Sequence, residues 1–182
     1  MAKIHEVGEE GEIRPFIWQD TFEIQPTTEH DRIAIGARDD QVSLLRKLMA
    51  CLPSELQVLY MLKVPRGGTK EGRYESPVVN HAAVESFLNT FGAALEGDGR
   101  HELWIGATEG DGLLVYDRHD IVYGYGPLDR FREIVTAAGF TESKVDVDVW
   151  HRHYYNAEFD DDTIRLLGHW DWRVCPLEPE DL

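Results

Sequence analysis

The sequence has few cysteines and no long apolar run. Its two cysteines, Cys51 and Cys175, are too few and too far apart for a disulfide framework or a zinc site. No apolar run approaches the roughly 18 residues that a membrane span requires. The charged segment 1–14 also lacks the apolar stretch of a secretory leader. We therefore expect a cytoplasmic protein that does not cross a membrane.

Basic residues are also scarce. Lys and Arg total 18 against 34 Asp and Glu, which gives a formal net charge of -16. A surface this negative repels nucleic acid backbones and anionic membranes, and it favours cationic partners or bound cations. By analogy of size and charge with small immunity and antitoxin proteins, our first functional hypothesis is a non-enzymatic acidic protein. Its partner is then a basic protein, and neither nucleic acid nor a membrane is expected to bind.

Signatures of nucleophilic catalysis and of nucleotide binding are absent. The chain contains no G-x-S-x-G, no phosphate loop of the G-x-x-x-x-G-K-[ST] type and no G-x-G-x-x-G that opens a helix. One basic stretch, residues 63–73, surrounds a Gly-Gly pair and contains Lys63, Arg66, Lys70 and Arg73. Two interpretations of it stay open: an anion-binding loop, or a mobile surface loop whose charges offset the acidic surface. On balance the sequence argues against an enzyme.

The composition nevertheless predicts a folded core. Apolar residues make up 42% of the 182 residues, which is enough to exclude wholesale disorder despite the charge. We predict a mixed α/β (α+β) fold, with a largely central β-sheet flanked by three to four helices, in a single domain over residues 13–176. The acidic segment 1–12 is expected to be flexible, with ordered structure beginning near Ile13, and the acidic tail 177–182 is expected to be solvated.

Hydrophobic patterns locate several elements within this domain. The nearly continuous apolar run 56–64 predicts a central strand covered by helices on both faces. Segments 113–116 and 121–125 predict a hairpin, because apolar runs flank a turn that contains two Asp residues. Ser76 followed by Pro77 predicts the start of a helix.

A histidine cluster follows a strand that is predicted from strict alternation over residues 144–150. If that strand continues, His151 and His153 lie on one face with their side chains roughly 7 Å apart. Two neutral imidazoles can hold a divalent metal together with a carboxylate, and Glu158 or His169 could complete the site. The alternative functional hypothesis is therefore a small metal-dependent or acid/base enzyme centred on this cluster.

The spacing of His151, His153 and Glu158 resembles the first metal motif of the cupin family, in which two His separated by one residue precede a Glu. The resemblance implies a metal site at these three residues and covers no other part of the chain. The glycines that flank the cupin motif and the second cupin motif are absent. The helical patterns also conflict with an all-β barrel, so we do not assign the chain to that family.

Three further interpretations stay open. The histidines at 151 and 153 could be structural, hydrogen-bonded to Asp146, Asp148 or the run 160–162 of three Asp residues. His119, in the turn of the predicted hairpin, is expected to be an exposed turn residue. Oligomerisation through an edge strand or the aromatic segment near the C-terminus is compatible with either functional hypothesis.

Overall fold

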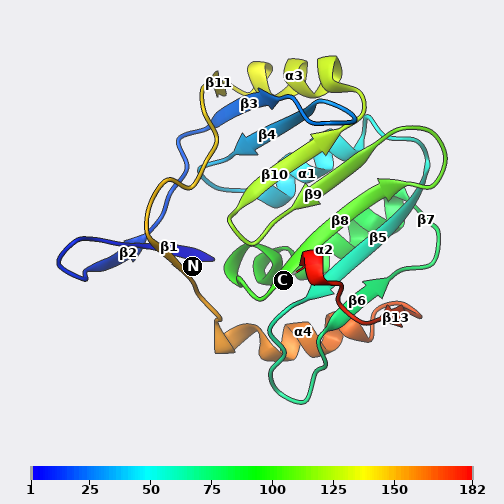
Figure 1. The fold of residues 1–182 in the computed structure, drawn as a ribbon. Coiled ribbons are helices and arrows are strands. Elements are labelled where there is room, and N and C mark those ends of the chain that lie inside the picture. Colours follow the sequence, from blue (N-terminus) through cyan, green and yellow to red (C-terminus); the bar gives the residue numbers. More distant parts are fainter. Residues whose placement is uncertain (1, 182) are drawn as a thin grey trace.

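A large β-sheet forms the centre of this computed structural model, which describes residues 2–181 (Figure 1). Its longer strands are β3 (Thr21–Gln25), β4 (Arg32–Gly36), β5 (Glu55–Leu62), β6 (Gly72–Glu75), β8 (His101–Ala107), β9 (Leu113–Tyr116) and β10 (Ile121–Tyr125). Shorter strands are β7 (Val79–Asn80), β11 (Thr141–Glu142) and β13 (Arg173–Cys175). The order across the sheet is β11-β3-β4-β10-β9-β8-β5-β6-β13, and β7 pairs with β5. Only β11 runs parallel to its neighbour.

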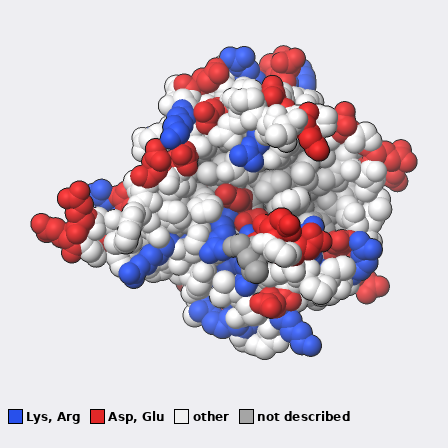
Figure 2. Space-filling view, in the orientation of Figure 1, with Lys and Arg blue, Asp and Glu red and all other residues white. Residues whose placement is uncertain are grey.

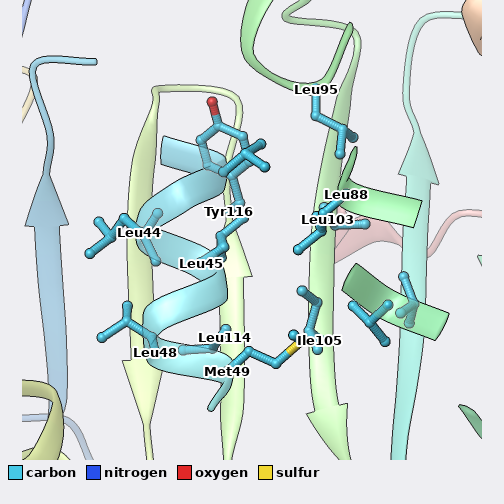
Figure 3. Packing of buried hydrophobic residues seen from close by; sticks show 14 of the residues in the cluster. Leu44, Leu45, Leu48, Met49, Leu88, Leu95, Leu103, Ile105, Leu114 and Tyr116 are labelled. Carbon is cyan, nitrogen blue, oxygen red and sulfur yellow. The ribbon is translucent and has the colours of Figure 1, made fainter. Parts of the chain in front are cut away.

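Four α-helices lie against this sheet or at its ends. They are α1 (Gln41–Met49), α2 (His81–Gly97), α3 (Leu128–Ala137) and α4 (Asp160–Leu167). Figure 1 shows α1 and α2 together on one face of the sheet. Figure 3 shows Met49 of α1 next to Ile105 of β8 and near Leu114 of β9, and both Ile105 and Leu114 are fully buried. The predicted class, a mixed α+β fold with a large central sheet and helices, is confirmed.

The prediction that β5 is covered by helices on both faces is wrong. Its residues alternate at the start of the strand: Leu56 and Val58 are fully buried, whereas Glu55 and Gln57 are exposed. An antiparallel sheet needs only one covered face, and both sheet neighbours of β5 on the main path are antiparallel to it. The apolar run extends to the end of β5 because both faces of the strand are buried there, at Met61 and Leu62.

A second, three-stranded sheet forms the arm that projects from the body in Figure 1. Its order is β12-β1-β2, with β1 (Ile4–Val7), β2 (Ile13–Pro15) and β12 (His151–His153), all antiparallel. Residues 4–7 are thus structured, in contrast to the flexible end predicted for residues 1–12, and Ile4 is fully buried. The reason is that β1 pairs with β12, about 150 positions away, and composition carries no trace of that pairing. Residue 1 lies outside the described residues.

The strand predicted over residues 144–150 does not form. Val145 is buried as the alternation predicts, but the segment crosses one face of the large sheet without joining it. The backbone of Val145 is hydrogen-bonded to side chains of β3 and not to the backbone of a neighbouring strand. Glu23 Oε2 accepts a hydrogen bond from the Val145 N–H at 3.0 Å, and Gln25 Nε2 donates to the Val145 carbonyl oxygen at 3.4 Å. Regular pairing begins only at His151, where β1 provides a partner.

Two other element boundaries differ from the prediction. Helix α2 begins at His81, and its N-cap is Asn80, whose side chain accepts the Ala83 N–H at 3.0 Å. Ser76 instead accepts a hydrogen bond from the Val58 N–H at 2.9 Å, which fastens the chain to β5. Near the C-terminus, Asp181 in a 3-10 helix (Pro179–Asp181) is buried, in contrast to the solvated tail predicted for 177–182. Residue 182 lies outside the described residues.

Candidate metal centre

Three histidines meet where the small sheet contacts the large one. His151 and His153 lie on β12, and His119 lies in the turn between β9 and β10. The ring centroids of His119 are 5.1 Å from His151 and 4.8 Å from His153, and the last two rings are 5.4 Å apart. One ring nitrogen of each residue lies within 4.8 Å of the other two. All three rings are partly exposed, so solvent ions can reach them.

The turn that carries His119 is organised by Asp117. One oxygen, Oδ1, accepts the N–H groups of His119 at 2.8 Å and of Ile121 at 2.9 Å. The other, Oδ2, lies 3.1 Å from Nδ1 of His119 and orients the imidazole. Asp120 adopts a left-handed conformation with φ of 62°, which Asp tolerates in turns. The prediction of a turn here is confirmed, but His119 is only about one-third exposed, with a side-chain value of 33%.

A buried lysine joins this turn to the small sheet. The side chain of Lys3 is 0% exposed, and its Nζ donates to the carbonyl oxygen of Asp117 at 3.2 Å. The same Nζ lies 3.4 Å from the ring centroid of Tyr116 and 3.8 Å from Oδ1 of Asp120. Burial lowers the pKa of Lys3, whereas the nearby carboxylates oppose that shift. Lys3 therefore acts as a positioning residue, since it fixes the strand that pairs with β12 against the turn that carries His119.

The register of the small sheet places both β12 histidines on the same face. His153 pairs with Ile4 and His151 pairs with Glu6, so these four side chains share one face of the sheet. Because Ile4 is fully buried, that face is turned toward the body of the protein. The His-x-His spacing thus has the consequence that the sequence predicts: both imidazoles are on one side of a strand.

Each imidazole has its Nδ1 held by an oxygen. Nδ1 of His151 is 3.0 Å from the Val149 carbonyl oxygen, and Nδ1 of His153 is 3.2 Å from the Arg118 carbonyl oxygen. A carbonyl or carboxylate oxygen only accepts, so each Nδ1 carries a proton, and in the neutral form of the ring the lone pair is on Nε2. Burial, reinforced by the positive charge of Arg118, lowers the pKa of His153 to about 3 and keeps that ring neutral.

The other predicted ligands lie apart from this group. Glu158 is an exposed residue of a 3-10 helix (Ala157–Phe159). His169 packs against aromatic residues of α2, with ring centroids 5.5 Å from Phe87 and 5.3 Å from Phe91. Among residues 2–181, the group formed by His119 and the two β12 histidines is the one in which three or more metal-binding side chains converge. Sequence reasoning missed His119 because its partners are more than 30 positions away.

The carboxylates suggested as structural partners of the histidines are used elsewhere. Asp146 and Asp148 both contact the ammonium group of Lys144, at 3.1 and 2.9 Å. Asp160, from the acidic run that begins α4, accepts hydrogen bonds from Nε of Arg66 at 3.0 and 3.1 Å. The hydrogen bonds from Arg66 hold the pKa of Asp160 below its usual value. The carboxylate that orients a histidine is instead Asp117.

Most of the basic side chains in the stretch 63–73 form ion pairs with acidic side chains. Lys63 lies 2.7 Å from Glu102, and Arg73 lies 3.2 Å from Asp181. With Arg66 bound by Asp160, three of the four basic residues are paired. The interpretation that the charges of this stretch offset acidic ones fits these contacts better than an anion-binding loop does.

Comparison of the chain with protein families, with curated proteins and with solved structures finds no match. The four helices among residues 2–181 also differ from the all-β barrel of the cupins, so the resemblance to the cupin motif stays confined to the His-x-His spacing. Among residues 2–181, no helix combines the length and the apolar character that crossing a membrane requires.

Proposed function

We propose that the protein binds a transition metal ion of the Zn²⁺ type through His119, His151 and His153. The observation that carries this proposal is the shared arrangement of the three rings: each Nδ1 is held by an oxygen, and one nitrogen of each ring converges on the others. Histidine ligands of metals typically donate their second ring N–H to a carbonyl or carboxylate in this way. Imidazole nitrogen is a preferred donor for Zn²⁺, Cu²⁺, Ni²⁺ and Fe²⁺.

The distances suit an ion bound by all three rings. Zn–N bonds of about 2.0–2.1 Å in a tetrahedral site place the ligand nitrogens about 3.4 Å apart. The nitrogens lie within 4.8 Å of one another, so small rotations of the partly exposed rings would bring them to that separation. Because His119 belongs to the β9–β10 turn and the other two to β12, the ion would fasten the small sheet to the large one.

Zinc titration of purified, untagged protein tests this function. We expect saturable binding with a stoichiometry of one ion per chain, and a higher melting temperature when the ion is present. Ligand at about 100 times its Kd stabilises a folded protein by about 2.7 kcal/mol. His119→Gln should lose most of both effects, because it removes one of three ligands and leaves the other two too few for tight binding.

Matched controls separate this site from the one predicted by sequence alone. His169→Gln and Glu158→Gln change the ligands that the sequence suggested, and both variants should bind zinc as the wild type does. His30→Gln, at an exposed position, controls for loss of any histidine. Zinc binding that disappears in His169→Gln and persists in His119→Gln would contradict the assignment.

A second function, binding of a basic protein partner, is favoured by the outer face of the small sheet. Trp150 is 85% exposed, and Ile13 is 43% exposed on the neighbouring hairpin. Trp150 pairs with Val7, which in turn pairs with Ile13, so the three side chains lie on the face opposite the histidines. An exposed Trp with apolar neighbours is typical of a contact surface.

The charge beside this apolar face is negative. Glu9, Glu10 and Glu12 form the exposed tip of the arm, which is the red projection on the left of Figure 2. A defined lysine- and leucine-rich peptide, with a fluorescent label, provides a direct probe. We expect Trp150→Ala to weaken its binding at every salt concentration and Glu10→Gln to weaken it mainly at low salt, since exposed charges are screened. Equal binding by wild type and Trp150→Ala would exclude this face.

A further inference from the structure

The face of the small sheet that carries the histidines also carries a carboxylate, Glu6 of β1. Glu6 is directly opposite His151 in the register of β1 with β12. The adjacent pair is hydrogen-bonded, because the Val7 N–H donates to the Trp150 carbonyl at 2.7 Å, so Glu6 and His151 form a pair of the non-hydrogen-bonded type. Side chains are closest in such pairs, with Cβ atoms about 4.5–5.5 Å apart. The Glu6 carboxylate is therefore within reach of an ion bound to His151.

An arginine on the third strand holds this carboxylate. Arg14 of β2 is opposite Glu6 on its other side, and its Nε donates to Oε1 of Glu6. The side chain of Arg14 is 69% exposed and that of Glu6 is 21% exposed. An ion pair with so exposed a partner contributes little stability, because water screens the charge and the long side chain loses entropy. An open hollow on the surface borders both residues, so the ion pair lies next to solvent.

We propose that Glu6 is the fourth ligand of the metal ion and that Arg14 competes with the ion for its carboxylate. This inference rests on the metal-binding function proposed above. A carboxylate oxygen is a suitable ligand for Zn²⁺ beside three imidazoles, and its charge offsets half of the charge of the ion. The carboxylate that the sequence analysis sought at Glu158 is thus provided by β1, across the sheet from His151.

The role of Glu6 is tested by zinc competition against a chromophoric chelator. Glu6→Gln should raise the Kd for Zn²⁺ by at least about tenfold, since even residues that only orient a ligand cost 10–100-fold when they are changed. Glu12→Gln is the matched control, because it removes the same charge from the exposed tip of the same arm. It should change the Kd by less than about twofold, since an exposed, distant charge is screened. Visible absorption of the Co²⁺-loaded protein should also change in Glu6→Gln and remain as in the wild type in Glu12→Gln.

The competition by Arg14 is tested in the opposite direction. Arg14→Gln should lower the Kd for Zn²⁺ by about two- to fivefold, which is the effect expected when an exposed ion pair is removed as a competitor. Arg152→Gln, an equal change of charge on the outer face of β12, should have a smaller effect. In the Glu6→Gln background, Arg14→Gln should no longer tighten binding, because no carboxylate is left to release.

The outcomes separate the two levels of the proposal. Absence of saturable zinc binding in the wild type overturns the metal function itself. If the wild type binds zinc and Glu6→Gln binds it as tightly as Glu12→Gln, the metal function stands and the role of Glu6 is overturned. Weaker binding by Arg14→Gln, or the same tightening with and without Glu6, overturns the competition by Arg14.

Discussion

Replacement of Asp98 by Asn should destabilise the protein strongly, because Asp98 is half of a buried ion pair. Its side chain is 2% exposed and that of Arg100 is 1% exposed. Asp98 Oδ2 lies 2.7 Å from Nε and 2.5 Å from Nη2 of Arg100. Removing one partner of a buried ion pair costs about 3–5 kcal/mol, because the other charge remains out of water. Nη1 of Arg100 keeps a second carboxylate, Asp160, at 2.9 Å, so we expect the lower end of that range.

Equilibrium urea unfolding, followed by tryptophan fluorescence, measures this loss. For Asp98→Asn we expect a free energy of unfolding lower by about 3 kcal/mol. In a chain of this length each kcal/mol shifts the melting temperature by about 2–4 °C, so the shift is roughly 6–12 °C. Arg100→Met should lower the free energy of unfolding by a similar amount, since it leaves the buried Asp98 carboxylate without its main partner. The double variant should cost about 2 kcal/mol less than the sum, because neither charge is then left without its partner.

The control is an ion pair of the same charges at the surface. Arg132 and Glu142 lie 2.7 Å apart with both side chains more than half exposed, so Glu142→Gln should cost no more than about 1 kcal/mol. The reasoning is refuted if Asp98→Asn costs less than about 1 kcal/mol. It is also refuted if the effects of Asp98→Asn and Arg100→Met are additive.

Three further predictions concern the surroundings of the metal centre. Burial lowers the pKa of His101 well below its usual value, so below pH 6.5 the unfolded chain binds a proton that the folded chain excludes. The contribution of His101 to the free energy of unfolding of the metal-free protein should fall by about 1.4 kcal/mol for each pH unit below 6.5, so His101→Leu should reduce the measured slope in urea unfolding by about that amount. Gly99→Ala should cost about 1–3 kcal/mol in the same assay, because a Cβ there would lie 3.0 Å from the Lys3 carbonyl oxygen and 3.2 Å from Cβ of His153. Lys3→Met should weaken zinc binding in a chelator titration more than it changes far-UV circular dichroism, since it releases the turn that holds His119 from β1.

Local patterns in the sequence are sufficient for several elements of the fold. The sequence predicts the hairpin of β9 and β10 with its observed bounds, because the two apolar runs and the Asp-rich turn lie within about a dozen residues. Residues 144–150 show the limit of such patterns. Alternation correctly predicts that Val145 is buried, but not whether the backbone pairs with a strand or, as here, with the side chains of Glu23 and Gln25.

The candidate site likewise combines features that follow from the sequence with features that depend on tertiary contacts. That His151 and His153 share one face follows from the two-residue period of a strand, which the sequence alone determines once a strand is assumed. Only the tertiary structure places His119 next to these two histidines, through the contact of buried Lys3 with the turn around Asp117. Pairing of β1 with β12 likewise brings Glu6 opposite His151. These contacts join residues from 114 to about 150 positions apart. Their energies depend on burial and register, which no local pattern encodes.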